Sequence, residues 1–286
     1  MEYYLGLNSE ENLNLNMLNN FSGVGMIRGE NLCINKLQYF TIPEFCDYVT
    51  GYLDYIAKTF KDKPVWYRTA DLVPHQINLL NGCDVYLKDD QYLIGNRGIR
   101  RNLTTINTYL KELNAFLKAY QQNNNLGLLI PFVSNLDEIK EVKRILETLG
   151  YDGKIGIMIE IPSIMLMLDE INELGIDYYT IGMNDLTSMI LGSHRDIYTY
   201  SMLDESVKKA VKYIVSKVHY FDKKITLAGY LKPEVLNFAQ DIGVDRINIH
   251  YNEIPLFFDI DNPNLYTYHY EQIKETYKQR KKERSK

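Results

Sequence analysis

Eight short apolar runs, separated by longer polar or amphipathic segments, constrain the fold of this chain more than any other feature of its sequence. Several of the runs are apolar on both faces, which is typical of strands that are buried in a parallel sheet. The runs are Tyr3–Leu7, Gly23–Ile27, Val65–Tyr67, Gly127–Ile130, Ile155–Ile159, Tyr178–Ile181, Ile225–Ala228 and Arg246–His250.

Helix signals lie between most of these runs. The segment Thr41-Ile-Pro-Glu44 predicts a capping box with proline at the first helical position. A second helix is expected to start in Ser134–Asp137 and to end before Gly150, which has the residue type common just beyond a helix end. Further helices are expected after Ser163 as far as Gly175, over 204–220 and over 233–240.

Alternating strands and helices predict parallel strands joined by crossover helices. Eight repeats favour closure into a (β/α)8 TIM barrel, with an open doubly wound sheet as the alternative. No shift in composition divides the chain, so we expect one barrel domain over residues 1–286, with a basic tail at about 270–286. The long segment 70–125 predicts one helix near 103–120 and a loop over the barrel mouth.

Composition excludes several classes of function. The net charge of −5 and the pI of about 5.6 argue against nucleic acid as the main partner, because binding phosphates needs a basic surface. There is no apolar stretch of eighteen residues, so we expect no membrane span, and the first residues lack the pattern of a signal peptide. The cysteines Cys33, Cys46 and Cys83 suggest neither a disulfide framework nor a zinc site, and a cytoplasmic location is expected.

Polar residues that end the apolar runs are the candidate site residues, because active sites of β/α barrels lie at the carboxyl ends of the strands. These residues are Arg28, Arg68, Glu160, Asn184 and Asp185, with Arg97 and Arg100 in the long segment. Two carboxylates on adjacent strands suit Mg2+, and arginines facing them would hold a phosphate and a carboxylate. Such a set stabilises a transferring phosphoryl group. The alternative is a salt-bridge network that only stabilises the barrel end.

The segments around these residues resemble the phosphoenolpyruvate (PEP)-utilising enzymes, specifically their C-terminal PEP/pyruvate-binding barrel. The family includes pyruvate phosphate dikinase, PEP synthase and enzyme I of the sugar phosphotransferase system. The resemblance extends from about Tyr4 to Ile254, and its last two segments are the most specific. The segments are GVGMIRGE (23–30), YRTAD (67–71), IGNRGIRR (94–101), LLIPFV (128–133), IMIEIPS (157–163) and IGMNDLTSMILGSHRD (181–196).

The resemblance implies roles for individual residues. Glu160 and Asp185 match the magnesium ligands of the family, while Arg68 and Arg97 match the ligands of the PEP phosphate. Catalytic roles are implied for Arg68, Arg97 and Arg195, the last of which matches an arginine that contacts substrate. The remaining substrate-binding positions are Arg28, near the phosphate, and Gly182, Met183 and Asn184, near the substrate carboxylate. Together they would stabilise the enolate of pyruvate against Mg2+.

Two departures from the family pattern bear on activity. Ala228, in ITLAGYLKP, stands where the family has the cysteine that protonates the enolate carbon, and Tyr230 replaces a nearby acidic or amide residue. The family also uses a phosphohistidine carrier domain and, in the dikinases, a nucleotide-binding domain. None of the five histidines lies in a carrier motif, and the sequence has no GxxxxGK[ST] loop. The resemblance therefore implies a separate phosphohistidine carrier and a separate ATP-binding protein.

Three hypotheses for function follow. The first is a Mg2+-dependent phosphotransferase component that binds PEP and pyruvate and works with those separate proteins, with Tyr230 or water in place of the missing acid. The second is a regulatory module that binds PEP without chemistry, which Ala228 favours. The third is a lyase that cleaves carbon–carbon bonds through the enolate of pyruvate, since a fold does not fix a function. Barrels of this family often form dimers, so a homodimer is expected.

Overall fold

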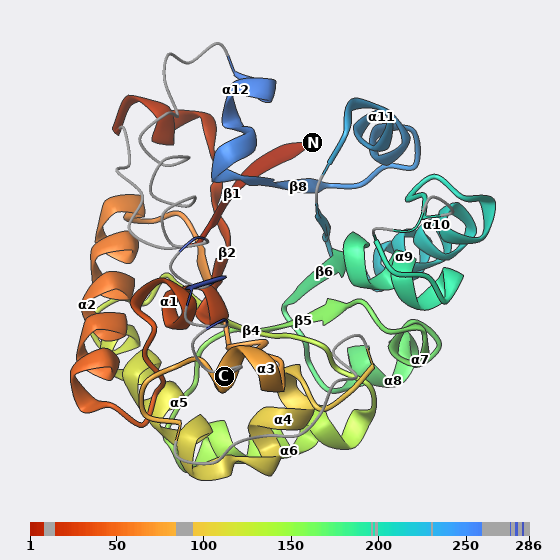
Figure 1. Ribbon diagram of the computed structural model, residues 1–286. Helices are drawn as coiled ribbons and strands as arrows, with labels where there is room; N and C mark the ends of the chain where they lie inside the picture. The colour runs from red at the N-terminus through yellow and green to blue at the C-terminus, as the bar shows by residue number, and fades with distance from the viewer. Residues whose placement is uncertain are drawn as a thin grey trace.

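The computed structural model describes residues 1–8, 15–83, 94–195, 197, 200–229, 231–258, 275, 278, 279 and 282. Eight parallel strands pair in chain order and close into a barrel, as Figure 1 shows in a view along the barrel. The strands are β1 (Glu2–Leu7), β2 (Gly23–Arg28), β3 (Val65–Arg68), β4 (Leu126–Ile130), β5 (Ile155–Ile159), β6 (Tyr178–Gly182), β7 (Ile225–Ala228) and β8 (Arg246–His250). The TIM-barrel prediction is confirmed, and each apolar run forms the strand expected of it.

Helices surround the barrel and shield the outer face of the strands (Figure 1). The helices are α1 (Gly29–Lys36), α2 (Pro43–Phe60), α3 (Pro74–Ile77), α4 (Gly98–Thr104), α5 (Ile106–Tyr120), α6 (Leu136–Thr148), α7 (Pro162–Met165), α8 (Leu168–Glu173), α9 (Met183–Leu191), α10 (Glu205–Tyr220), α11 (Pro233–Asp241) and α12 (Ile254–Phe257), with 3-10 helices η1 (Leu15–Asn20) and η2 (Tyr251–Glu253). Most of the expected basic tail, and Tyr230, lie outside the described residues.

The predicted helix starts are partly corrected. The helix α2 begins at Pro43 as expected, but the capping box at Thr41 is wrong, because Thr41 Oγ1 donates a hydrogen bond to the Gly82 carbonyl at 2.6 Å instead. The start of α6 is capped by Asn135, whose side chain accepts from the Glu138 amide at 2.9 Å. Two predicted helices are each divided in two, as α4 and α5 around Thr105 and as α7 and α8.

An apolar layer fills the interior of the barrel and forms a floor beneath its mouth. One inward side chain from each of six strands builds this layer: Met26, Trp66, Leu129, Met158, Tyr178 and Ala228. The rings of Trp66 and Tyr178 stack across the interior with centroids 4.3 Å apart. Because side chains alternate between the two faces of a strand, the next inward residues after Trp66 and Met158 are Arg68 and Glu160. The alternation therefore directs these two charges into the barrel mouth.

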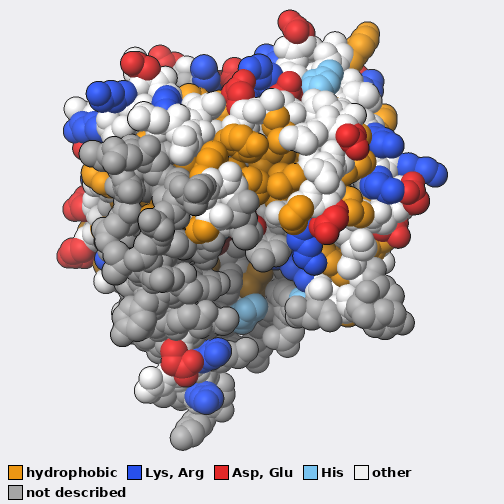
Figure 2. Space-filling model, turned by 90° about the horizontal axis from the view of Figure 1, so that it is seen from above, with side chains coloured by type: hydrophobic (Ala, Val, Ile, Leu, Met, Phe, Trp, Pro, Cys, Tyr) orange, Lys and Arg blue, Asp and Glu red, His pale blue; other side chains and the backbone are white. Residues whose placement is uncertain are grey.

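Figure 2 shows the charged and apolar side chains of the described residues on one face of the molecule. Lys and Arg side chains there are interspersed with Asp and Glu, and apolar side chains gather between them. Among the described residues, no helix combines the length and hydropathy needed to cross a membrane.

Candidate metal and phosphate site

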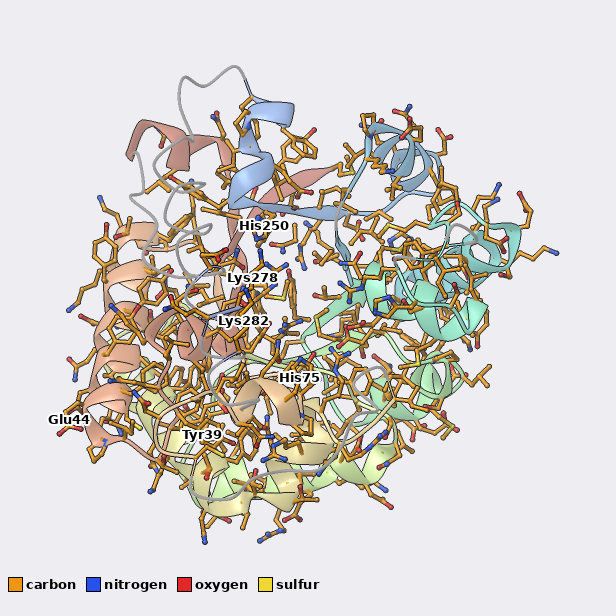
Figure 3. All side chains as sticks on the ribbon, in the orientation of Figure 1. Tyr39, Glu44, His75, His250, Lys278 and Lys282 are labelled. Atoms are coloured by element: carbon orange, nitrogen blue, oxygen red, sulfur yellow. The ribbon has the colours of Figure 1, made fainter. Side chains whose placement is uncertain are left out.

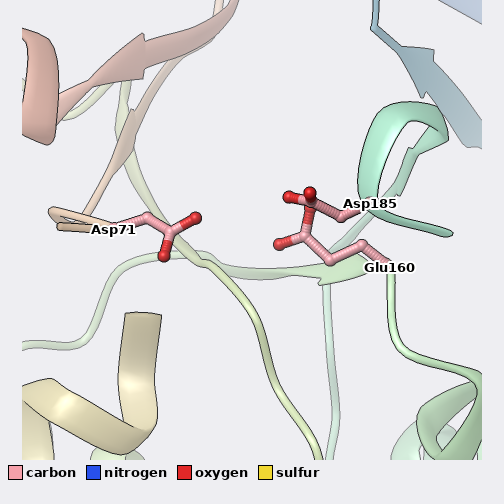
Figure 4. Close-up of side chains that lie close together, drawn as sticks. All are labelled: Asp71, Glu160 and Asp185. Carbon is pink, nitrogen blue, oxygen red and sulfur yellow. The ribbon is translucent and has the colours of Figure 1, made fainter. Parts of the chain in front are cut away.

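Three buried carboxylates converge at the barrel mouth. Asp71 follows β3, Glu160 follows β5, and Asp185 lies in the first turn of α9 after β6. One oxygen from each lies within 4.8 Å of the others, and Figure 4 shows the three side chains directed toward one another. Such a set of oxygen ligands suits a hard divalent cation. The structure thus brings together the two acids singled out in the sequence and adds Asp71, which sequence reasoning missed although it ends the quoted YRTAD segment.

Two of the predicted arginines face these acids. Arg97, at the start of α4, pairs with Asp71 through Nε–Oδ1 at 3.0 Å and Nη2–Oδ2 at 2.5 Å, and its Nη2 also lies 3.1 Å from Asp185 Oδ2. Arg195 Nη2 donates to Asp185 Oδ1 at 2.8 Å. The Arg97 side chain is 12% exposed and that of Arg195 is 47% exposed. Arg97 is therefore an internal member of the site, whereas Arg195 lies at its solvent edge.

Phe132, just after β4, positions both an acid and an arginine. Its backbone adopts φ 54°, in the left-handed region that a bulky residue rarely occupies. In this conformation the Phe132 amide donates to Glu160 Oε1 at 2.7 Å, and the Arg97 guanidinium lies 4.3 Å from the centre of the Phe132 ring. Backbone strain of this kind persists where the surroundings enforce it, often at functional sites. Here it fixes Glu160 and Arg97 relative to each other.

Two of the three converging acids, Glu160 and Asp71, differ in proton affinity. Burial, reinforced by the negative charge of Asp185, raises the pKa of Glu160 well above the usual glutamate range. Burial also acts to raise the pKa of Asp71, but the charge and hydrogen bonds of Arg97 outweigh it and hold that pKa below the usual range. In the absence of a cation, Glu160 therefore keeps its proton to higher pH than Asp71 does.

Binding of Mg2+ is expected to release a proton at neutral pH, because the cation requires the ionised form of Glu160. The apparent Mg2+ affinity should rise as pH rises toward the elevated pKa of Glu160 and level off above it. Calorimetric titrations in two buffers with different ionisation enthalpies measure the number of protons released. Identical heats in both buffers near pH 7 would contradict the expected protonation of Glu160.

Gly182, the last residue of β6, leaves space for the Glu160 carboxylate. A Cβ at this position would overlap Glu160 Oε2 and would also lie 2.9 Å from Glu160 Cβ. Replacing Gly182 with alanine should therefore displace the carboxylate and lower Mg2+ affinity about tenfold. The control is Gly51→Ala on the surface of α2, where an added Cβ meets nothing within 4 Å. Equal Mg2+ affinities in calorimetry for the two variants would count against this close packing.

Arg68 lies next to the acids in a buried ion pair. Its Nη2 contacts Glu30 Oε1, and both side chains are about nine-tenths buried. The Arg68 Nε atom is buried and has no hydrogen-bond partner within the described part of the chain. A buried donor without a partner is costly, so a bound oxygen atom would complete its hydrogen bonding. A buried donor of this kind is consistent with the prediction from the sequence that Arg68 binds the phosphate of PEP.

The other arginines and the start of α9 are placed differently. Arg28 donates to Asn8 Oδ1 at 2.7 Å on the β1 side of the mouth, whereas Arg97 and Arg195 form the ion pairs with Asp71 and Asp185. Arg100 lies 3.9 Å from Glu138 and is more than a third exposed. The helix α9 starts at Met183, directly after Gly182. Amides in a first helical turn lack partners within the helix and can bind a carboxylate.

Comparison with protein families decides the family of the chain. The model of the PEP-utilising enzyme PEP-binding domain matches residues 2–257. The chain belongs to the PEP-utilising enzyme family. It is 26% identical over 252 residues to a PEP synthase of Pyrococcus furiosus, which covers 82% of this chain and 31% of that protein. It is 29% identical over 217 residues to a PEP-dependent phosphotransferase system protein of Escherichia coli, covering 69% of this chain and 28% of that protein.

The chain spans less than a third of the length of either relative. Solved structures with the same fold are more distant. An aldolase/citrate lyase family protein of Burkholderia cenocepacia has a TM-score of 0.54 at 13% identity and covers 87% of each chain. A malate synthase of Haloferax volcanii, in a magnesium/glyoxylate complex, has a TM-score of 0.53 at 11% identity, covering 87% of this chain and 70% of that one. These likenesses concern the fold alone.

Ala228 stands where the resemblance to PEP-utilising enzymes implies a cysteine. It is buried, pairs with Gly182 on β6 and with Asn248 on β8, and directs its methyl group into the apolar interior layer. A side chain at this position is therefore adjacent to the site and level with Gly182, the residue that leaves space for Glu160. The methyl group itself has no proton to donate. Tyr230, named as a substitute acid, lies outside the described residues.

Proposed function

We propose that this chain is a Mg2+-dependent component of a phosphotransferase that binds PEP and pyruvate at the barrel mouth. The observation that carries the proposal is the convergence of three buried carboxylates within 4.8 Å of one another, faced by Arg97 and Arg195. Family membership supports the substrate class. We also propose that a separate phosphohistidine carrier and a separate ATP-binding protein complete the reaction, as the resemblance to PEP-utilising enzymes implies.

The acidic residues would bind the cation, and the arginines would bind the phosphoryl group. Glu160 and Asp185, with Asp71 beside them, would hold the cation, which supplies positive charge to the oxygen on which the enolate charge develops. Arg68 Nε and the Arg97 guanidinium would hold the phosphoryl oxygens, since planar guanidinium groups match this geometry. Arg97 would have to exchange part of its bonding to Asp71 and Asp185 for these oxygens.

The opposite end of the substrate would lie on α9 and β7. The first-turn amides near Gly182, Met183 and Asn184 would receive the carboxylate. The methyl carbon of pyruvate would then approach Ala228, where the family has its acid. A regulatory module that binds PEP without turnover is the second candidate, and the methyl group of Ala228 favours it.

Calorimetry with oxalate, an analogue of the pyruvate enolate, tests the proposed binding. Oxalate and PEP should bind only when Mg2+ is present, and a phosphohistidine carrier from a related phosphotransferase should become phosphorylated when PEP is added. If PEP binds but none of the carriers tested becomes phosphorylated, the regulatory candidate is favoured. Absence of Mg2+-dependent binding would refute both.

Replacing Ala228 with cysteine should restore proton exchange at the methyl group of pyruvate. A thiol there can accept and return the proton, so with Mg2+ in D2O the loss of the methyl signal in proton NMR should accelerate at least about tenfold. Ala228→Ser is the matched control, because its hydroxyl has a similar size but is a much weaker acid. If the cysteine variant exchanges no faster than the serine variant, the methyl carbon does not lie at this position.

A further inference from the structure

A small cavity lies outside the ring of strands, behind the segment that follows β3. Its lining includes the polar side chains of Tyr39, Arg101, Asn102 and Glu112, together with Ala70. Figure 3 places Tyr39 outside the barrel, on the side of α2 and α5. The cavity has room for a group of about the size of one water molecule. None of the three acids at the mouth lines it, so it is separate from the candidate metal and phosphate site.

Arg101, in the last turn of α4, brings a buried positive charge to this cavity. The residue is 5% exposed, and its Nε atom is buried without a hydrogen-bond partner among the described residues. No ion pair within the described part of the chain includes Arg101. A buried charge is costly unless a counter-charge and hydrogen bonds compensate it. The guanidinium therefore requires an anion beside it.

Glu112 is the acidic residue in the described lining, but it is engaged elsewhere. Its Oε1 accepts hydrogen bonds from the Tyr67 hydroxyl and from the Ala70 amide. Burial raises the pKa of Glu112 to about 8, so the carboxyl is mostly protonated at neutral pH. Glu112 therefore does not supply the full negative charge that Arg101 requires.

Tyr39 adds a second donor to the cavity. Its hydroxyl forms a hydrogen bond with the Arg101 side chain, and burial raises its pKa to about 12, so it keeps its proton. A guanidinium has only donors, so the Tyr39 oxygen is the acceptor in this bond. The O–H of Tyr39 is then left to donate to another group. Arg101 Nε and Tyr39 O–H together form a pair of donors with one positive charge.

We propose that this cavity is a binding site for a small monovalent anion of the size of chloride, held by the side chains of Arg101 and Tyr39. The single charge of Arg101 matches one negative charge, and the small space excludes larger anions such as phosphate or PEP. A water molecule could accept from Nε but would leave the buried charge uncompensated. The inference does not depend on the proposed function, because the site is separate from the barrel mouth.

Urea unfolding in sodium chloride and in sodium gluconate tests the site in the unmodified chain. Gluconate has the charge of chloride but is too large for the cavity, so ionic strength is the same in both series. Raising chloride to about ten times its dissociation constant should increase the ratio of folded to unfolded chain about tenfold, because the anion binds only the folded chain. This gain is measured against Arg101→Met, in which the general effects of the two salts persist.

Arg101→Met removes the charge and keeps much of the side-chain volume. In gluconate this variant should be at least as stable as the wild type, because it removes a buried charge without a counter-charge. The matched control is Arg144→Met on the surface of α6, where the arginine is exposed and pairs with Glu141. The control should respond to chloride as the wild type does. Equal chloride responses in the wild type and in Arg101→Met would overturn the proposal.

Bromide locates the anion directly. Crystals grown with bromide in place of chloride should show an anomalous scattering peak within hydrogen-bond distance of Arg101 Nε. Tyr39→Phe keeps the ring but removes the hydroxyl, so chloride affinity should fall about three- to tenfold. This variant tests the site even if Arg101→Met does not fold. Water without bromide at Arg101 Nε, or unchanged chloride affinity in Tyr39→Phe, would overturn the proposed pair of donors.

Discussion

Replacing Glu160 with glutamine is expected to weaken Mg2+-dependent binding of PEP and oxalate by at least about a hundredfold. Substitutions that only support a metal ligand already cost 10- to 100-fold in affinity, and Glu160 is one of the three converging acids itself. The amide oxygen of glutamine can still accept the hydrogen bond from the Phe132 amide, so the barrel mouth should keep its shape. The loss would therefore report on the cation and not on folding.

Glu112→Gln is the matched control for this experiment. Glu112 is also a buried glutamate, and burial raises its pKa to about 8. It accepts hydrogen bonds from the Tyr67 hydroxyl at 2.9 Å and from the Ala70 amide at 2.7 Å, but it is not one of the three acids that converge at the mouth. The Glu112 variant should bind Mg2+ and oxalate as the wild type does. Calorimetry that shows similar losses for both variants would mean that Glu160 acts through stability alone.

The barrel and the meeting of Glu160 with Asp185 were both predictable from the sequence. Runs such as Ile155–Ile159 are short, apolar on both faces and followed by a polar residue, so strand identity and strand end follow from local pattern. Parallel strands all finish at the same mouth, which places the two acids close together without knowledge of any contact. These inferences need only periodicity and topology.

Other features depended on long-range contacts that no local pattern contains. Asp71 lies three residues beyond β3, and its pairing with Arg97, at the start of α4, and its position beside Glu160 and Asp185 are long-range contacts. His250 ends the apolar run Arg246–His250, yet its ring contacts Asn8, which lies near the other end of the chain. Thr41 matched a capping pattern, yet its hydroxyl bonds to Gly82 because the segment after α3 passes beside it.

Replacing Arg68 with methionine is expected to lower the free energy of unfolding by about 3–5 kcal/mol, a large part of the total stability of a domain. The substitution keeps much of the side-chain volume but leaves the Glu30 carboxylate buried without its partner. Glu30 then retains only weaker support, including the Asp71 amide, which lies 3.4 Å from its Oε2. Urea unfolding measures the loss.

The double variant Arg68→Met/Glu30→Gln separates the ion pair from the loss of packing. Glutamine carries no charge, so the penalty for an unpaired buried carboxylate disappears, and the double variant should be more stable than Arg68→Met alone. It should nevertheless fail to bind PEP, because the Arg68 Nε donor is absent from both variants. Recovery of stability without recovery of binding would show that Arg68 both neutralises Glu30 and holds the substrate. A double variant no more stable than the single one would mean that an unpaired charge on Glu30 does not cause the loss in Arg68→Met, and that the loss comes from packing.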